Sequence, residues 1–258
     1  DEAAAALTEN TVLVSSMLVN NETGALYPVA DLFRLAKAKC PDVICHCDAV
    51  QGFLKVPLSP RTLGADIVTV SAHKIHGPKG MAALYVSPEI LKRRALVPVI
   101  HGGQQENGLR AGTENVIGIA GFGAAAAVGA AHFAADREAL KTLGAYLLDR
   151  LAADAPLREI KVNRPASAMP HIISLTLPDI KSETMLHFLS GKGICVSSGS
   201  ACSSHAKKVS RALSAYGLSD RAADCTIRIS LAHTNTADEL DALCAALGEG
   251  LSTLIRIR

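Results

Sequence analysis

The sequence predicts an α/β fold with a mainly parallel sheet, followed by a smaller α+β domain. In the first half of the chain, short apolar runs rich in β-branched residues alternate with longer segments of helical periodicity, which is typical of βα units. After about residue 134 this alternation gives way to an amphipathic helix and shorter mixed elements. The chain has 258 residues, of which 49% are hydrophobic, so it can bury the core of one large or two modest domains. We therefore divide it into residues 1–134 and 135–258.

The first domain is expected to contain strands joined by helices. A helix over residues 29–39 starts after Pro28, which suits a helix start. An Ala- and Gly-rich segment at 113–136 predicts a long helix. It does not follow a strand and lacks the G-x-G-x-x-G order, so a dinucleotide-binding loop is disfavoured. The expected strands are 12–18, 43–47, 67–71 and 82–86.

The second domain is expected to mix helices and strands around a loop at 155–170 that is rich in Pro, Asn and Ser. Thr236 and Glu239 have the spacing of a capping box and mark the start of a closing helix. The other expected helices are 137–151, 182–190 and 209–216, and the expected strands are 171–177, 194–197 and 226–231.

Composition disfavours several classes of partner. A net charge of +2, 3% aromatic residues and no Trp argue against nucleic acid and anionic membranes as the main partner. No apolar run approaches the roughly 18 residues of a membrane span. Seven scattered cysteines without a regular framework indicate a reducing compartment, so we expect a cytoplasmic protein.

Five clusters of polar residues could carry chemistry. The first four follow expected strands or lie in loops, and ligands bind at the carboxyl ends of the strands in parallel sheets. The clusters are 20–24 (NNETG), 46–51 (HCDAVQ), 71–74 (SAHK), 110–113 (RAGT) and 198–204 (SGSACSS).

Asp48 ends a buried strand, where an ionised carboxylate needs a cation or strong hydrogen bonds. Taken alone, it also fits a turn or helix-capping residue. Strand alternation places Asp48 on the same side as His46 and opposite Cys45 and Cys47. This arrangement disfavours a zinc site, and we expect no metal.

Lys74 follows another buried strand. A lysine desolvated in a cleft becomes a nucleophilic amine that can form a Schiff base, although most lysines, as we expect for Lys79, are solvated surface groups. Arg228 lies between Ile227 and Ile229 in an expected strand. It could bind a carboxylate or close an internal ion pair, and the residues alone do not favour either.

Cys202 lies in a run of Gly and Ser that suits an exposed loop, where a thiolate could react. Cys195 and Cys244 have more apolar neighbours and are expected to be buried structural residues.

Taken together, the five clusters resemble the cysteine desulfurases of the class V aminotransferase family, which use pyridoxal phosphate (PLP). The matching motifs are NNETG, H-x-D-A-x-Q, S-x-H-K, R-x-G-T and SGSACSS, and the resemblance runs essentially from end to end. It implies the aspartate aminotransferase-like fold type I for the large domain and removal of sulfur from L-cysteine as the activity.

The resemblance implies a cofactor role for six residues. Lys74 would join PLP covalently, Asp48 would keep the ring nitrogen protonated and Gln51 would bind the ring hydroxyl. Ser71 and His73 would contact the phosphate. Thr113 would reach the phosphate of a neighbouring subunit's cofactor, which implies a homodimer.

The resemblance also implies a substrate site. Asn21 and Arg228 would hold the carboxylate of L-cysteine, and Lys74 would shuttle the Cα proton. The Cys202 thiolate would attack the substrate sulfur, giving L-alanine and a persulfide on Cys202. The SGSAC loop resembles the subgroup whose cysteine passes sulfur to acceptors such as an iron-sulfur scaffold protein.

One departure from the family concerns the start of the chain. In the family about a third of the protein precedes NNETG and supplies phosphate donors and a His stacked on PLP, whereas 20 residues precede Asn21 here. We therefore expect a fragment of a cysteine desulfurase, or a site that a separate chain completes. The alternatives are a catalytically silent remnant that keeps the dimer and partner-binding surfaces, and a selenocysteine lyase.

Overall fold

The computed structural model describes residues 2–198 and 210–257 and divides the chain into two compact units. The first unit comprises residues 1–19 and 27–133, and the second comprises residues 20–26 and 134–258. The sequence-based division differs in one segment, because residues 20–26 pack with the second unit and not with the strand that precedes them.

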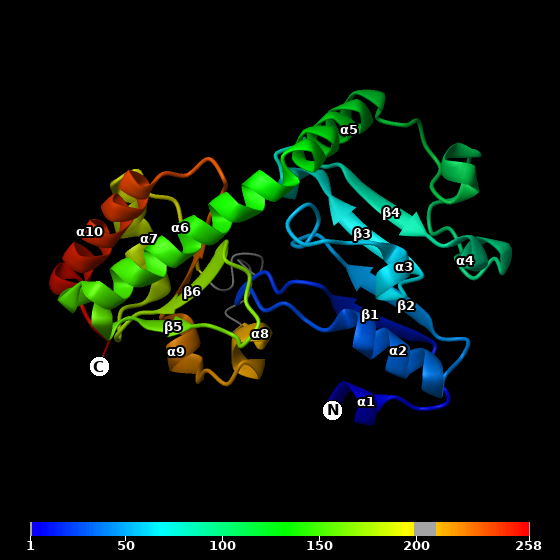
Figure 1. The fold of residues 1–258 in the computed structure, drawn as a ribbon. Coiled ribbons are helices and arrows are strands. Elements are labelled where there is room, and N and C mark those ends of the chain that lie inside the picture. Colours follow the sequence, from blue (N-terminus) through cyan, green and yellow to red (C-terminus); the bar gives the residue numbers. More distant parts are fainter. Residues whose placement is uncertain (1, 199–209, 258) are drawn as a thin grey trace. The chain divides into compact units, whose positions relative to one another are not determined.

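The first unit is built on a four-stranded sheet, and the expected strands at these positions are confirmed. The order is β1-β2-β3-β4; β1, β2 and β3 are parallel, whereas β4 is antiparallel to β3. This is the mainly parallel α/β sheet that the sequence predicts (Figure 1). The strands are β1 (Leu13–Met17), β2 (Ile44–Asp48), β3 (Ile67–Ser71) and β4 (Ala82–Val86).

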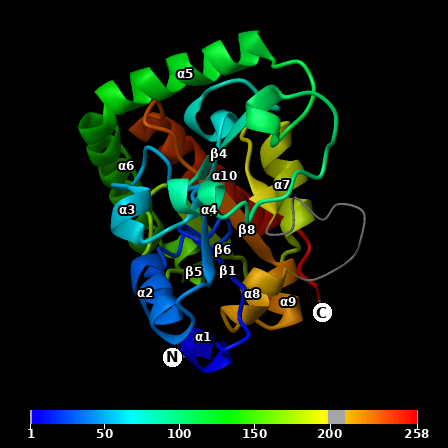
Figure 2. The ribbon, with the colours of Figure 1, turned by 90° about the vertical axis from the view of Figure 1, so that its right-hand side faces the viewer.

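Helix α2 (Val29–Lys39) packs on β1 and β2 through Val29, Phe33 and Ala36, which recur at helical spacing and are buried. Helix α1 (Glu2–Ala6) lies against α2 (Figures 1 and 2). The remaining helical segments of this unit are α3 (Pro60–Leu63), η1 (Ala72–Ile75), α4 (Pro88–Lys92), η2 (Gln105–Gly108) and α5 (Val116–Ala131).

The second unit is a four-stranded antiparallel sheet of order β5-β6-β8-β7 with helices on one face. Alternate residues of β6 and β8, such as Leu175 and Ile227, point into a core formed with α6, α7 and α10 (Figure 1). The strands are β5 (Lys161–Asn163), β6 (Ile172–Thr176), β7 (Ser197–Ser198) and β8 (Thr226–Ser230). The helices are α6 (Phe133–Ala153), η3 (Ala155–Glu159), α7 (Ser182–Gly191), α8 (Arg211–Ala215), α9 (Asp220–Asp224) and α10 (Ala237–Thr253).

The structure corrects several expected boundaries. The long helix expected at 113–136 ends at Ala131, and α6 begins at Phe133, because His132 leaves the helical conformation (φ −102°, ψ 6°). The loop expected at 155–170 contains η3 and β5, and the strand expected at 194–197 is reduced to β7. Residue 209, the start of one expected helix, lies outside the described residues.

No single helix in the described ranges is long and apolar enough to span a membrane. The pair α5 and α6 reaches that length and hydropathy when both helices are counted together.

The capping box expected at the start of α10 is confirmed. The Glu239 N–H donates to Thr236 Oγ1 (3.3 Å) and the Thr236 N–H donates to Glu239 Oε2 (3.0 Å). Replacing Thr236 with alanine leaves the Glu239 N–H unsatisfied, so we expect the free energy of unfolding to fall by about 1 kcal/mol. Urea denaturation measures this loss, and Thr234→Ala, at an exposed position nearby, is the control. Equal stability of the two variants would contradict the prediction.

Candidate functional site

In the first unit, Asp48 is the last residue of β2 and is half-buried. Its Oδ1 accepts a hydrogen bond from the Val50 N–H (3.0 Å), and no other described residue donates to the carboxylate, so Oδ2 is available. Burial, reinforced by the Asp48 charge, raises the pKa of the neighbouring Cys47 thiol to about 11. Asp48 therefore combines a turn contact with an oxygen free to bind a ligand.

On the face of the sheet that carries Asp48, the neighbouring side chain His46 links adjacent strands by hydrogen bonds. The His46 ring bridges three strands, with Nδ1 2.7 Å from Ser15 Oγ and Nε2 2.8 Å from Thr69 Oγ1. Cys45 and Cys47 are buried on the opposite face, as strand alternation predicts. Asp48 pairs in register with Thr69 of β3, so both residues lie near the same sheet edge.

Lys74 lies in η1, directly after the carboxyl end of β3, and is half-buried. Two backbone hydrogen bonds close this turn, from the Ala72 N–H to the Met81 carbonyl (3.0 Å) and from the Gly77 N–H to the Ala72 carbonyl (2.9 Å). Because β2 and β3 are parallel neighbours, Asp48 and the turn that carries Lys74 lie at the same edge of the sheet.

The other four residues expected to bind the cofactor differ in surroundings. Ser71, at the end of β3, is buried, and its Oγ lies 2.7 Å from Nδ1 of the exposed His73. Gln51 is half-buried in the turn that follows Asp48, and Thr113 is exposed just before α5. The structure thus places Asp48, Gln51, Ser71, His73 and Lys74 after two neighbouring strands, with Thr113 on a separate loop.

In the second unit, Arg228 projects from β8 on the face opposite α6, α7 and α10. Its Nη1 donates to the backbone carbonyl of Asn21 (2.8 Å) and its Nη2 donates to Ser197 Oγ (3.1 Å). Its Nε is buried and has no partner among the described residues. Among the described residues, no carboxylate forms a salt bridge with Arg228. The guanidinium is therefore available to bind the carboxylate of a ligand.

The NNETG segment forms a tight turn beside Arg228. Asn20 Oδ1 accepts hydrogen bonds from the N–H groups of Glu22 (2.9 Å) and Thr23 (2.9 Å). Gly24 has φ +73°, and a Cβ there would lie 2.6 Å from the Ile172 carbonyl oxygen. The side chains of this motif therefore shape the backbone that presents the Asn21 carbonyl to Arg228.

Sequence reasoning missed two charged residues near the expected site residues. The first is Glu22. Burial raises the pKa of its carboxyl group, while a hydrogen bond from Ser210 (2.5 Å) and the charge of Arg228 act against this rise. The second is Lys55, whose Nζ donates to the Lys74 carbonyl (2.7 Å). The available signals were the glutamate inside NNETG and a lysine inside the apolar run GFLKVPL.

Of the cysteines singled out from the sequence, Cys202 lies outside the described residues. Cys244 is buried in the core of the second unit, as expected. The expectation for Cys195 was wrong: it is exposed, in the connection between α7 and the two-residue edge strand β7.

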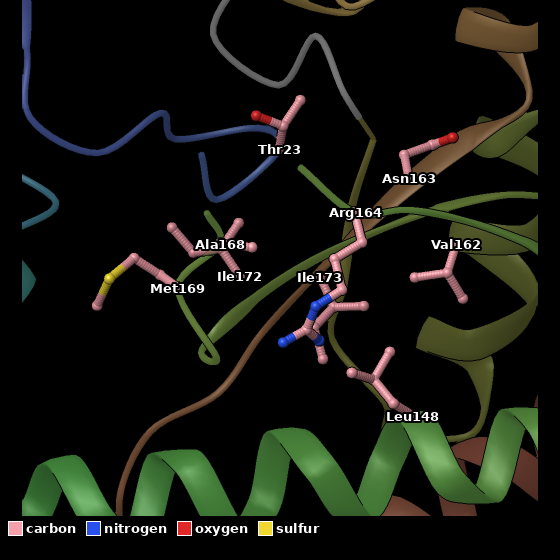
Figure 3. Close-up of a pocket in the computed structure, with 9 residues that line it drawn as sticks. All are labelled: Thr23, Leu148, Val162, Asn163, Arg164, Ala168, Met169, Ile172 and Ile173. Atoms are coloured by element: carbon pink, nitrogen blue, oxygen red, sulfur yellow. The ribbon is translucent and has the colours of Figure 1, made fainter. Parts of the chain in front are cut away.

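A small cavity in the second unit is bordered by Thr23, Arg164 and Met169 among others (Figure 3). Its volume of about 10 Å³ is near the lower limit for one water molecule. It is therefore too small for an amino acid or a cofactor.

The fold and these motifs are those of the PLP-dependent transferases of fold type I. Residues 1–243 match the aminotransferase class-V family, and the chain belongs to it. The resemblance seen in the sequence is thereby confirmed, and enzymes of this family depend on PLP.

The relatives within this family are cysteine desulfurases. A cysteine desulfurase of Trichormus azollae is 38% identical over 250 residues, which cover 96% of this chain and 60% of the relative. Cysteine desulfurase IscS of Dictyoglomus turgidum is 36% identical and is covered to 59%. The chain thus spans about 60% of the length of the curated relatives it matches.

Solved structures give the same result for the fold. A NifS-like protein superposes with a TM-score of 0.86 at 35% identity, covering 98% of this chain and 64% of that protein. The structure of SspA in complex with cysteine superposes with a TM-score of 0.72 at 31% identity, covering 91% and 63%.

Proposed function

We propose that the protein acts as a PLP-dependent cysteine desulfurase, converting L-cysteine to L-alanine while sulfur passes to Cys202. One observation carries this proposal: an acid and an amine, Asp48 and Lys74, follow the carboxyl ends of two adjacent parallel strands. That edge is where parallel sheets bind ligands. The names of the relatives and the cysteine in the SspA structure favour this activity over other class-V reactions.

The donor set of the first unit fits PLP. When bound, PLP supplies an electron-withdrawing ring that weakens the bonds at the substrate α-carbon. Asp48 Oδ2 is available to keep a proton on the ring nitrogen, and Gln51 follows in the adjoining turn to hydrogen-bond the ring hydroxyl. Ser71 and His73 supply donors for the phosphate at the end of β3.

Lys74 and Arg228 act on the substrate. Lys74 Nζ would hold PLP covalently, and the same amine would move the proton at the substrate Cα. Arg228, whose buried Nε has no partner among the described residues, would receive the substrate carboxylate, and Asn21 lies beside it.

Cys202 accepts the sulfur. Its thiolate attacks the substrate sulfur, so that an S–S bond forms as the Cβ–S bond breaks, and the carbon is protonated to give L-alanine. Cys202 then carries a persulfide, which an acceptor such as an iron-sulfur scaffold protein takes up in the cytoplasm. We also propose a homodimer in which the exposed Thr113 reaches the partner's phosphate.

Reductive trapping tests the proposal. The protein is incubated with PLP, reduced with borohydride, digested and mapped by mass spectrometry. We expect the label on Lys74 and its loss, by about tenfold or more, in Lys74→Ala, because the covalent link needs this amine. Lys79→Ala, at an exposed lysine of the same loop, is the control and should label like the wild type.

The result also separates the alternatives. Protein that stays colourless and unlabelled at Lys74 would contradict the proposal and favour the silent remnant. With labelled protein, Cys202→Ala should abolish alanine formation from cysteine, and persistent activity in this variant would contradict the role of Cys202. Comparing cysteine with selenocysteine as substrate tests the selenocysteine lyase alternative.

A further inference from the structure

Lys55 lies close to Lys74, although the proposed chemistry assigns it no part. It follows β2 by seven residues, is half-buried and lies among apolar residues of the segment GFLKVPL. Its Nζ lies 2.7 Å from the carbonyl oxygen of Lys74 and donates to it. Because lysines are seldom buried unless their ammonium is partnered, this contact needs an explanation.

The segment that carries Lys55 is fixed by its own hydrogen bonds. The Gly52 and Phe53 N–H groups donate to the Ala49 carbonyl (2.9 and 2.8 Å), and the Lys55 N–H donates to the Gly52 carbonyl (2.9 Å). Leu54 has a left-handed backbone (φ 56°), which is rare outside glycine and requires support from its surroundings.

Packing supplies that support. The Leu54 side chain lies so close to α5 that a Cβ on Gly129 would be 2.8 Å from Leu54 Cδ1. The direction of Lys55 is thus determined by the neighbouring Leu54 and by the turn.

This segment connects the two proposed cofactor contacts. Asp48 and Val50 form the start of the turn, and Lys55 at its end reaches the backbone of Lys74. The Lys55 hydrogen bond therefore links the loop after β2 to η1. It limits how far the acid and the amine can move relative to each other.

The electrostatics of Lys55 agree with this geometry. Burial, and then the charge of Lys74, lower the pKa of Lys55 to about 8. The two lysines therefore lie close enough for the Lys74 charge to act on the Lys55 amine.

We propose that Lys55 is a positioning residue for Lys74: its hydrogen bond to the Lys74 carbonyl holds the turn that carries the reactive amine. The role of the amine rests on the function proposed above. The effect of Lys55 on the turn does not rest on that function, because it depends only on the hydrogen bond to the Lys74 carbonyl.

The hydrogen bond is tested without PLP by hydrogen–deuterium exchange. In Lys55→Met, which keeps the length and the apolar stem of the side chain, we expect the peptide covering 72–77 to exchange about tenfold faster, because the turn opens more often. Lys79→Met should match the wild type, since that side chain is exposed. Unchanged exchange in Lys55→Met would overturn the inference, whatever happens with PLP.

The effect on the amine is tested by the rate of reductive PLP trapping at Lys74 between pH 6 and 9. We expect trapping about tenfold slower in Lys55→Met throughout this range, and near the wild-type rate in Lys55→Arg, which keeps a hydrogen-bond donor at this position. A Lys55→Met rate equal to that of the wild type would overturn the positioning role. If wild-type Lys74 takes no label, the proposed function fails, and the exchange experiment alone decides on the Lys55 contact.

Discussion

Replacing Gly24 with alanine is expected to lower the free energy of unfolding by about 4 kcal/mol. Two effects add at this position. A non-glycine residue at φ +73° costs about 1–2 kcal/mol. The added Cβ would also lie 2.6 Å from the Ile172 carbonyl oxygen, so the backbone of the turn or of β6 must shift, and overpacking of this kind costs about 1–3 kcal/mol.

Gly193 provides a matched control in the same unit. It has a similar backbone (φ +77°), but a Cβ there would meet nothing within 4 Å. Gly193→Ala should therefore cost about 1–2 kcal/mol, the backbone effect alone. Urea denaturation of both variants measures the difference. If Gly24→Ala were no less stable than Gly193→Ala, close packing of NNETG on β6 would be disproved.

The site is affected along with stability, because the Gly24 turn also presents the Asn21 carbonyl to Arg228. The sequence marked this motif as polar and functional. The structure shows that Asn20, Thr23 and Gly24 serve the backbone of the turn, while Arg228 offers the free donor. A side chain that builds a turn and one that binds a ligand look alike in a sequence, since both are polar and both follow a strand.

Strand positions could be predicted because β-branched runs of five residues carry a strong local signal, as in IVTVS of β3. The short helices α3, α4 and α9 were missed, because four or five residues span about one turn and show no periodicity. The break at His132 was missed as well, since the Ala-rich sequence around it favours a helix on both sides.

Lys55 shows the limit of sequence reasoning at the site. A single lysine among apolar residues usually extends its amine to solvent along its own stem. Its burial depends on the left-handed Leu54 and on the distance to the Lys74 carbonyl, and both are set by tertiary packing against α5 and η1. No local pattern encodes these contacts.

The half-buried Lys55 should also make stability depend on pH. Its pKa falls from 10.5 in the unfolded chain to about 8 in the folded protein, so between these values the unfolded state binds more protons. The contribution of Lys55 to stability is therefore greatest above pH 10.5 and is lost as pH falls to about 8. A shift of this size corresponds to about 3 kcal/mol.

The thiols of Cys45 and Cys47 act in the opposite direction. Burial raises the pKa of each to about 11, so their contribution is fully present below pH 9 and is lost as pH rises toward 11. The wild-type profile alone therefore mixes opposing effects. A comparison with Lys55→Met removes this problem, because both proteins keep the two cysteines.

We expect the unfolding free energy of the wild type minus that of Lys55→Met to rise by about 3 kcal/mol between pH 8 and 10.5, and to stay constant from pH 6 to 7. Urea denaturation at half-unit pH steps under reducing conditions measures this difference. Lys79→Met, which removes an exposed charge of the same sign, should give a nearly flat difference over the whole range. A flat difference for Lys55→Met as well would mean that the pKa of Lys55 does not fall on folding, and would contradict the prediction.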